Sequence, residues 1–315
     1  MSEVVQGLPT PEELERAVRL LAVQSRREVS SAFAGGYRSA FRGGGVEFEE
    51  SRPYTPGDDV RSLDWNAMAR TGEPWVKRFR EERDQTVLLA LDVSASMRFG
   101  TSGSAKATVA AHAGALVAAA AARAGDRVGL LCFDGAVRAE LRPGRGEAHL
   151  WRVLRALVGA AGAPEGGTSL SLALTRARTL LRRRSVVILL SDFRDDAFFT
   201  PGEGRAPDPG LVALAKHHDV VAAVLQDPRE DELPAVGTVR FGDPEGEGPV
   251  LVLRSGSRRV RARYAAACAL RRRALERRLR RDGADVLWLP THRDPLGALS
   301  RFFRRHPGAP RGAAA

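Results

Sequence analysis

Five side chains with hard oxygen atoms, carried by three separate loops, are the clearest chemical signal in this 315-residue sequence. In the stretch LLALDVSASM an apolar run ends at Asp92, and Ser94 and Ser96 follow at every second position. Thr168 follows two glycines in EGGTSL, and Asp192 ends the apolar run VVILLSDF. Mg²⁺, Ca²⁺ and Mn²⁺ prefer carboxylate and hydroxyl oxygens as ligands. The sequence therefore predicts a site for a hard divalent cation, with Mg²⁺ as the first candidate.

The alternation of Asp92, Ser94 and Ser96 supports this interpretation. Side chains at every second position of an extended chain point the same way, so one carboxylate and two hydroxyls can converge beyond the strand. Asp, Ser and Thr are also common N-cap and turn residues, so each loop taken alone is explained equally well by the start of a helix. The same set of hard oxygens in three loops at strand-to-helix junctions favours the metal site.

Strands that are apolar throughout alternate with helical segments from residue 84 onward, which is typical of a mostly parallel sheet covered on both faces. We expect strands in TVLLALDV, RVGLLCFD, AVRAEL, SVVILLSDF, DVVAAVLQD and ADVLWLP, and an inserted β-hairpin in GTVRFGDPEGEGPVLVLR. Helices are expected at residues 106–124, 147–160, 169–183, 208–218, 258–282 and 294–305. Ligands of such sheets bind beyond the carboxyl ends of the strands, where Asp92 and Asp192 are placed.

The N-terminal part of the chain has a different character. Thr10 and Glu13 have the spacing of a capping box, which predicts a helix at 11–30. Residues 35–84 are rich in glycine and charge and show little periodicity, so we expect irregular loops and short strands there. The opposite charges between Arg52 and Asp84 favour an ion-pair network that pins this segment to the main domain, over a binding surface. We therefore divide the chain into an appendage packed on the main domain (1–83), the α/β domain (84–305) and a disordered tail (306–315).

Charge gives only weak information about partners. The 49 basic and 38 acidic residues leave a net charge of +11, and the predicted basic helix at 258–281 holds eleven arginines against the single acid Glu276. Such a helix could grip phosphates, but its arginines fall on every side, which favours a solvated or partner-facing helix. We expect no nucleic-acid partner.

The N-terminal sequence and the two cysteines predict a cytoplasmic protein. The N-terminus carries acids where a secretory signal has basic residues. The apolar segment at 106–124 is mostly alanine and includes His112, so it is expected to be a buried helix and not a membrane span. Cys132 and Cys268 form no close pair and no zinc-type spacing, as expected for ordinary buried thiols in a reducing compartment.

No catalytic pair is apparent, so we do not expect an enzyme. A phosphotransferase of the haloacid-dehalogenase type would need a second carboxylate where Ser94 stands. The segment GTSGSAKAT lacks phosphate-loop spacing, and no G-x-S-x-G motif frames Ser94 or Ser96. A metal-assisted hydrolase and a metal-free structural scaffold, whose acids are only caps, are the alternatives to a binding module.

The D-x-S-x-S motif, the distant Thr168 and the later Asp192 together resemble the metal-ion-dependent adhesion site of von Willebrand factor A domains, over residues 84–305. The resemblance implies a Rossmann-like doubly wound α/β fold. It also implies that Ser94, Ser96 and Thr168 supply hydroxyl ligands, and that Asp92 and Asp192 act mostly through water. In that family an acidic side chain of a partner completes the metal shell.

A second resemblance extends over nearly the whole chain. RPYTPGDDVRSLDWNAMARTGEPWVKRFREERD, GDRVGLLCFD and LGALSRFFRRH are similar to an uncharacterised prokaryotic group of such proteins, a domain of unknown function commonly encoded beside MoxR-type AAA+ ATPases. Many members have transmembrane helices before this signature, where this chain has a short helix. The resemblance implies a metal-dependent interaction module that works with a MoxR-type ATPase, or with a client protein that supplies the acid.

Overall fold

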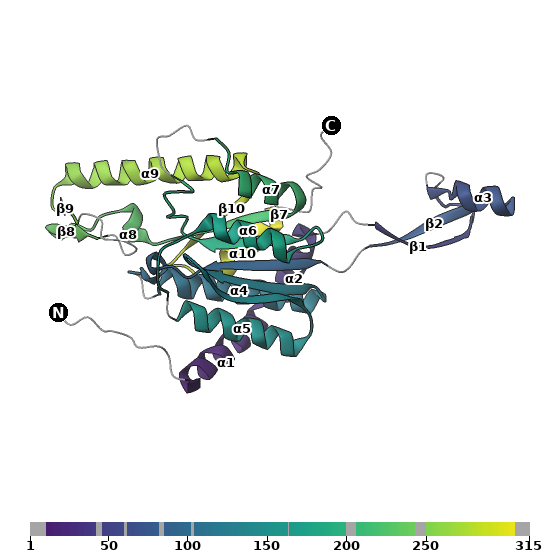
Figure 1. The fold of residues 1–315 in the computed structure, drawn as a ribbon, viewed down its shortest axis with the longest axis horizontal. Helices are drawn as coiled ribbons and strands as arrows, with labels where there is room; N and C mark the ends of the chain where they lie inside the picture. The colour runs from purple at the N-terminus through teal and green to yellow at the C-terminus, as the bar shows by residue number, and fades with distance from the viewer. Residues whose placement is uncertain are drawn as a thin grey trace.

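A six-stranded sheet forms the centre of the protein in a computed structural model, which describes residues 11–41, 46–59, 62–81, 85–101, 104–162, 164–199, 206–242 and 250–305 (Figure 1). The spatial order of its strands is β10-β7-β6-β3-β4-β5. All neighbours are parallel except β4 and β5. The strands are β3 (Thr86–Asp92), β4 (Arg127–Phe133), β5 (Val137–Gly144), β6 (Val186–Ser191), β7 (Asp219–Gln226) and β10 (Asp285–Pro290).

The order of the strands fixes where a ligand should bind. In chain order the sheet reads 3-2-1-4-5-6, the doubly wound arrangement, which confirms the fold class expected from the sequence. The order reverses between β3 and β6, which lie side by side with Leu91 opposite Leu190. Ligands of doubly wound sheets bind at this switch point, beyond the carboxyl ends of the strands. Asp92 and Asp192 come from these two neighbouring strand ends.

Helices cover both faces of the sheet because the strands are buried on both sides. Leu89 and Leu91 of β3 face one hydrophobic cluster, and Leu88 and Ala90 face the other. The first cluster includes α1 (Pro11–Glu28), α2 (Ser31–Ala40), α4 (Lys106–Ala124), α5 (Glu147–Ala161) and α10 (Pro295–Arg305). The second includes α6 (Leu170–Leu180), α7 (Pro209–His217) and α9 (Arg258–Arg281).

Helix α4 occupies the residues expected from the sequence. It is long and apolar enough to cross a membrane, but 72% of its most apolar 18-residue window is buried inside the protein. Alanine is small, so α4 packs closely on the sheet and against α5 and α1. Its burial is that of a core helix, as predicted.

Helix α2 was not expected, because Gly35 and Gly36 disfavour a helix. Tertiary packing outweighs this intrinsic cost. Phe33 and Tyr37 are buried, and both rings contact the ring of Phe303 in α10. Residues 306–315, expected to be a disordered tail, lie outside the described residues.

The charged signature segment forms an arm and not a clamp. β1 (Val46–Pro53) and β2 (Trp75–Glu81) pair as an antiparallel hairpin that carries α3 (Trp65–Thr71), and Figure 1 shows this arm projecting away from the sheet. The arm itself projects from the sheet, whereas α1 and α2 of the same N-terminal appendage pack on the main domain. Arg52 binds Asp58 at 2.7 Å and Lys77 lies 4.0 Å from Asp64, so these charges are satisfied within the arm.

The inserted hairpin is confirmed as β8 (Thr238–Phe241) paired with β9 (Leu251–Arg254). It lies between the short helix α8 (Pro228–Asp231) and the basic helix α9. Three arginines of α9 lie over aromatic rings: Arg271 over Phe199, Arg272 over Trp288 and Arg278 over Phe198. Part of the positive charge of α9 therefore serves to attach the helix to the sheet.

Candidate metal centre

Asp92 is held rigidly at the end of β3. The residue is fully buried. Its Oδ1 accepts a hydrogen bond from the Ser94 backbone N–H at 2.9 Å, and its Oδ2 accepts one from the Ser191 hydroxyl at 2.5 Å. Ser191 was missed by the sequence analysis; it lies directly before Asp192 at the end of the neighbouring strand. Both oxygens of Asp92 are thus oriented by the two strands of the switch point.

The hydroxyls of Ser94 and Ser96 lie close together, but not on an extended chain. Ser94 is extended, and the chain then turns into a short 3₁₀ helix, η2 (Ala95–Arg98). The two hydroxyl oxygens lie 3.2 Å apart, and both residues are buried. The Ser94 side chain makes no capping hydrogen bond to η2. A simple capping role therefore does not account for Ser94.

The loop that carries Thr168 is attached to the loop after β3 by backbone hydrogen bonds. The Ala95 N–H donates to the Gly166 carbonyl, and the Glu165 N–H donates to the Val93 carbonyl, both at 2.9 Å. Gly166 has φ +69°, and a side chain there would come within 3.2 Å of the carboxylate of Asp134. Ser169, and not Thr168, caps α6.

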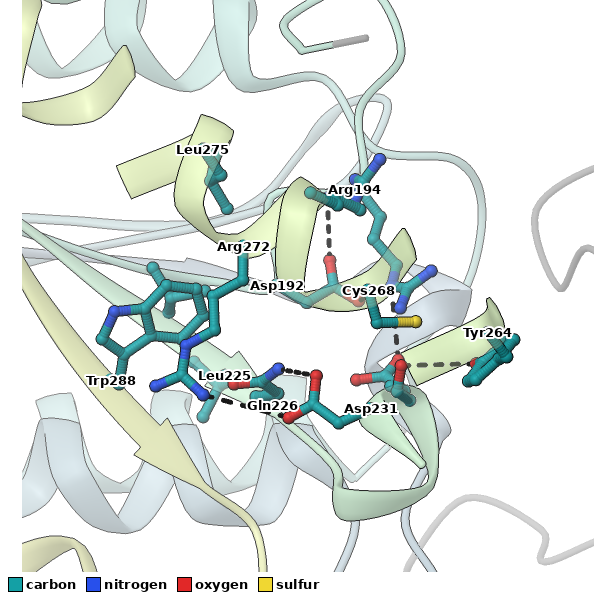
Figure 2. Close-up of a pocket in the computed structure, with 13 residues that line it drawn as sticks. Asp192, Arg194, Leu225, Gln226, Asp231, Tyr264, Cys268, Arg272, Leu275 and Trp288 are labelled. Atoms are coloured by element: carbon teal, nitrogen blue, oxygen red, sulfur yellow. Dashed lines mark hydrogen bonds and ion pairs between the residues drawn. The ribbon is translucent and has the colours of Figure 1, made fainter. Parts of the chain in front are cut away.

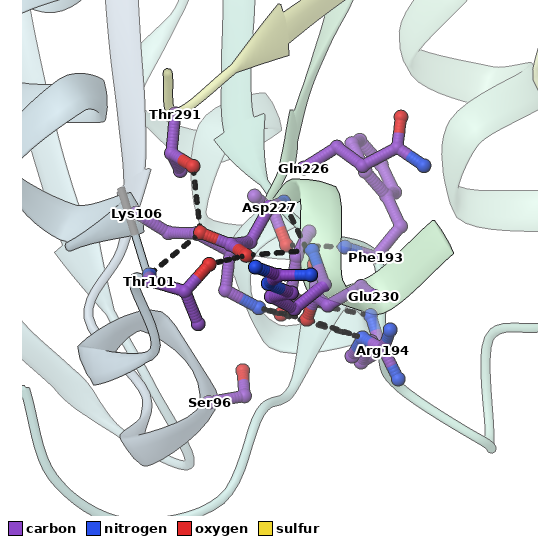
Figure 3. A network of polar contacts seen from close by, with 12 residues as sticks. Ser96, Thr101, Lys106, Phe193, Arg194, Gln226, Asp227, Glu230 and Thr291 are labelled. Carbon is purple, nitrogen blue, oxygen red and sulfur yellow. Dashed lines mark hydrogen bonds and ion pairs between the residues drawn. The ribbon is translucent and has the colours of Figure 1, made fainter. Parts of the chain in front are cut away.

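Asp192 faces an internal cation that the sequence analysis did not identify. The ammonium of Lys106, the first residue of α4, binds Asp192 Oδ2 and lies 2.8 Å from the carboxylate of Glu230 (Figure 3). The Lys106 side chain is fully buried. The other oxygen of Asp192 accepts a hydrogen bond from the Arg194 N–H at 3.1 Å. A lysine at the start of an otherwise apolar helix was the signal in the sequence.

The two aspartates differ in their electrostatic state. Burial, reinforced by the nearby charge of Asp192, raises the pKa of Asp92 to about 7. Burial also acts to raise the pKa of Asp192, but the ammonium of Lys106 and its hydrogen bond outweigh it, and the pKa is lowered. Asp192 is therefore ionised at neutral pH, whereas Asp92 is near its titration midpoint. An added positive charge would favour the ionised form of both.

The second cation-facing acid, Glu230, is positioned by a network at the end of β7. Asp227 accepts hydrogen bonds from the hydroxyls of Thr101 and Thr291, which lie after η2 and after β10 (Figure 3). The backbone N–H of Asp227 donates to Glu230 at 3.0 Å, which forms a capping box at the start of α8. Glu230 is thereby directed toward Lys106 and also lies 3.3 Å from Arg194.

A pocket of about 210 Å³ opens beside Asp192, between α8, α9 and the ends of β7 and β10 (Figure 2). Its lining combines the acids Asp192, Glu230 and Asp231 with the arginines Arg194, Arg271 and Arg272. Of the five predicted ligand residues only Asp192 lines this pocket, so the hollow borders the centre at that residue.

The residues fit a hard divalent cation. The carboxylates of Asp92 and Asp192 are close enough to interact, and the hydroxyls of Ser94 and Ser96 are adjacent to the first of them. The Thr168 loop is bound to the same turn. These donors are hard oxygens. Lys106 shows that the centre already attracts positive charge.

Comparisons with known proteins identify a matching family and several relatives. The profile of the family described as "Protein of unknown function DUF58" matches residues 50–274. Uncharacterized proteins of Mycobacterium bovis and Mycobacterium tuberculosis are each 34% identical over 290 residues, covering 92% of this chain and 88% of theirs.

Two solved structures are similar to the chain at low sequence identity. The conserved hypothetical protein BatB from Bacteroides thetaiotaomicron is 19% identical with a TM-score of 0.41, covering 70% of this chain and 98% of its own. A von Willebrand factor type A structure from Catenulispora acidiphila is 13% identical with a TM-score of 0.36, covering 73% of this chain and 43% of its own.

Proposed function

The chain belongs to the protein family of unknown function DUF58, and on that premise we propose that its Asp92 centre is a metal-dependent docking site for an acidic side chain of a partner protein. One observation carries the proposal. Buried carboxylates from both strands of the switch point lie beside paired hydroxyls and next to an open pocket. Such a centre is suited to binding a ligand.

The residues of the chain have separate tasks in this function. Asp92, Ser94, Ser96, Thr168 and Asp192 would hold Mg²⁺ or another hard cation. When bound, the ion supplies an electrophilic centre that attracts an outside carboxylate, since neutral hydroxyls in its shell leave much of its charge uncompensated. Ser191 and the Ser94 N–H orient Asp92. Lys106 balances the charge of Asp192 in the metal-free protein.

We propose a cytoplasmic MoxR-type AAA+ ATPase, or a client that it remodels, as the partner that supplies the acid. Support comes from the resemblance of the arm signature. The chain would then act as an adaptor and not as an enzyme.

Calorimetric titration with Mg²⁺ and a pull-down test this function. We expect Asp92→Ala to abolish Mg²⁺ binding while the fold is retained, and we expect capture of a MoxR-type ATPase to be lost both in the variant and with chelator. Asp196→Ala, in the loop after β6, is the matched control. Mg²⁺ affinity that is unchanged in Asp92→Ala, or capture that is equal with and without chelator, would refute the proposal.

One observation favours a second candidate. Lys106 already neutralises Asp192, so the ammonium itself could be the resident cation of a metal-free binding scaffold. In that case the wild-type protein binds no Mg²⁺ in the same titration, and partner capture survives chelation but is lost in Lys106→Met. The two candidates therefore give opposite results with chelator.

A further inference from the structure

A second cluster of metal-ligating side chains lies on the face of the sheet that α4 covers. Glu28 at the end of α1, His112 in α4 and Asp294 just before α10 each present one ligand atom, and these atoms all lie within 4.8 Å of one another. From this geometry we infer that Glu28, His112 and Asp294 form a binding site for a transition-metal ion of the Zn²⁺ class.

The spacing suits tetrahedral coordination. Zn–N and Zn–O bonds of about 2.1 Å place two ligands of a tetrahedral ion roughly 3.4 Å apart. His112 Nε2 lies 3.2 Å from Glu28 Oε2, so this pair is already at that separation. Asp294 needs to approach by an ångström or so, which is within reach of a side-chain rotation, and its residue is exposed.

The ligand types distinguish this site from the Asp92 centre. An imidazole nitrogen with two carboxylate oxygens is a ligand set for Zn²⁺ and neighbouring transition metals, whereas Mg²⁺ prefers oxygens alone. Three protein ligands leave one position for water. The side chains of His112 and Glu28 are about one-quarter exposed (23% and 27%), so an ion can enter from solvent.

Each ligand stands on a packed element, and none depends on a long loop. Val29, directly after Glu28, is buried, and its carbonyl accepts a hydrogen bond from Arg123 at 2.7 Å. His112 lies between the buried Ala111 and Ala113. Oδ1 of Asp294 accepts the Leu296 N–H at 3.0 Å at the start of α10. Rigid support of this kind keeps Glu28 and His112 near a productive geometry, while the exposed Asp294 side chain completes the site by rotation.

The site joins parts of the chain that are remote in sequence. Glu28 and Asp294 lie outside the residues matched by the family profile, and His112 lies inside them. A bound ion would therefore fasten the N-terminal helix α1 and the start of α10 to the central domain. It would stabilise the folded chain by mass action, because the three ligands meet only when the protein is folded.

The test is a Zn²⁺ titration of the full chain after chelator treatment. We expect one Zn²⁺ per chain, bound both by the wild type and by Asp92→Ala, which separates this site from the Asp92 centre. His112→Asn and Glu28→Gln should each weaken binding at least ~10-fold, the minimum effect of losing even an outer-shell partner. His217→Asn, an exposed histidine at the end of α7, should bind Zn²⁺ as the wild type does.

Thermal unfolding gives an independent measurement. Zn²⁺ should raise the melting temperature of the wild type and of His217→Asn, and should leave that of Glu28→Gln nearly unchanged. Equal Zn²⁺ affinity in the wild type, His112→Asn and Glu28→Gln would overturn the assignment. So would the absence of Zn²⁺ binding to the wild type, which would leave His112 and Glu28 as an ordinary ion pair.

Discussion

At the scale of single residues, the candidate centre contains two carboxylates whose pKa values are shifted in opposite directions. Asp92 has no cationic partner among the described residues, and burial raises its pKa to about 7. Asp192 is ionised because the ammonium of Lys106 lies against it. The centre therefore holds a charge pattern that a divalent cation would change, and each aspartate can be tested separately.

The raised pKa of Asp92 predicts a pH dependence of stability in chelator. In the unfolded chain Asp92 titrates near pH ~4, so between about pH 4 and pH 7 the folded state binds more protons, and the free energy of unfolding falls as pH rises. Asp92→Asn cannot ionise and should lose less stability than the wild type between pH 5 and pH 8. Urea unfolding at both pH values measures this. If the wild type and Asp92→Asn lose the same free energy of unfolding between these pH values, ionisation of Asp92 does not destabilise the folded state.

Lys106→Met tests whether the ammonium and a metal compete. Removal of one partner from a buried ion pair typically costs about 3–5 kcal/mol, so we expect a large loss of stability in chelator. Added Mg²⁺ should restore more stability in the variant than in the wild type, because it no longer shares Asp192 with Lys106. Lys216→Met, an exposed lysine of α7, is the control. Equal Mg²⁺ affinities in wild type and Lys106→Met would contradict competition.

At the scale of secondary-structure elements, the sequence predicted the regular part well. The strand ends that carry Asp92 and Asp192 and the bounds of α4 follow from apolar runs and spacing, which are local signals. Ser191, Glu230 and the role of Lys106 could not be predicted, because their partners come from other elements. A local pattern identifies a residue type but does not identify the distant group that the residue will face.

Helix α2 also depends on contacts that are distant in the sequence, and one of these contacts can be tested. The hydroxyl of Tyr37 donates to Asp126 at 2.9 Å in the core, and this contact spans 89 residues of sequence. Tyr37→Phe keeps the ring contacts with Phe41 and Phe303 but removes the hydrogen bond. We expect a loss of about 1–3 kcal/mol in the free energy of unfolding, measured in urea. Tyr54→Phe on the arm is the control, and an equal effect of both substitutions would exclude a specific role for this hydrogen bond.

At the scale of the whole molecule, the protein consists of a doubly wound body and an arm. The density of charge in the arm predicted a clamp, but ion pairs stabilise whichever fold brings their members together. Here Arg52 and Asp58 are only six residues apart and meet within the hairpin. Asp64 caps α3 and accepts the hydroxyl of Ser51 across the hairpin at 2.6 Å. Charge density alone therefore did not reveal where the segment lies.

Because the arm projects away from the body, we expect the body to fold and to bind Mg²⁺ without the arm. Replacement of residues 46–81 by a short Gly-Ser linker removes the paired strands and α3, while the sheet, its helices and the Asp92 centre keep their contacts. We expect the melting temperature to change by less than about 4 °C, the shift that roughly 1 kcal/mol produces in a domain of this size. Mg²⁺ affinity measured by calorimetry should equal that of the intact chain. A large drop in the melting temperature or in the Mg²⁺ affinity would show that the arm packs against the body in solution. Only such packing would let removal of the arm affect the site at the carboxyl ends of β3 and β6.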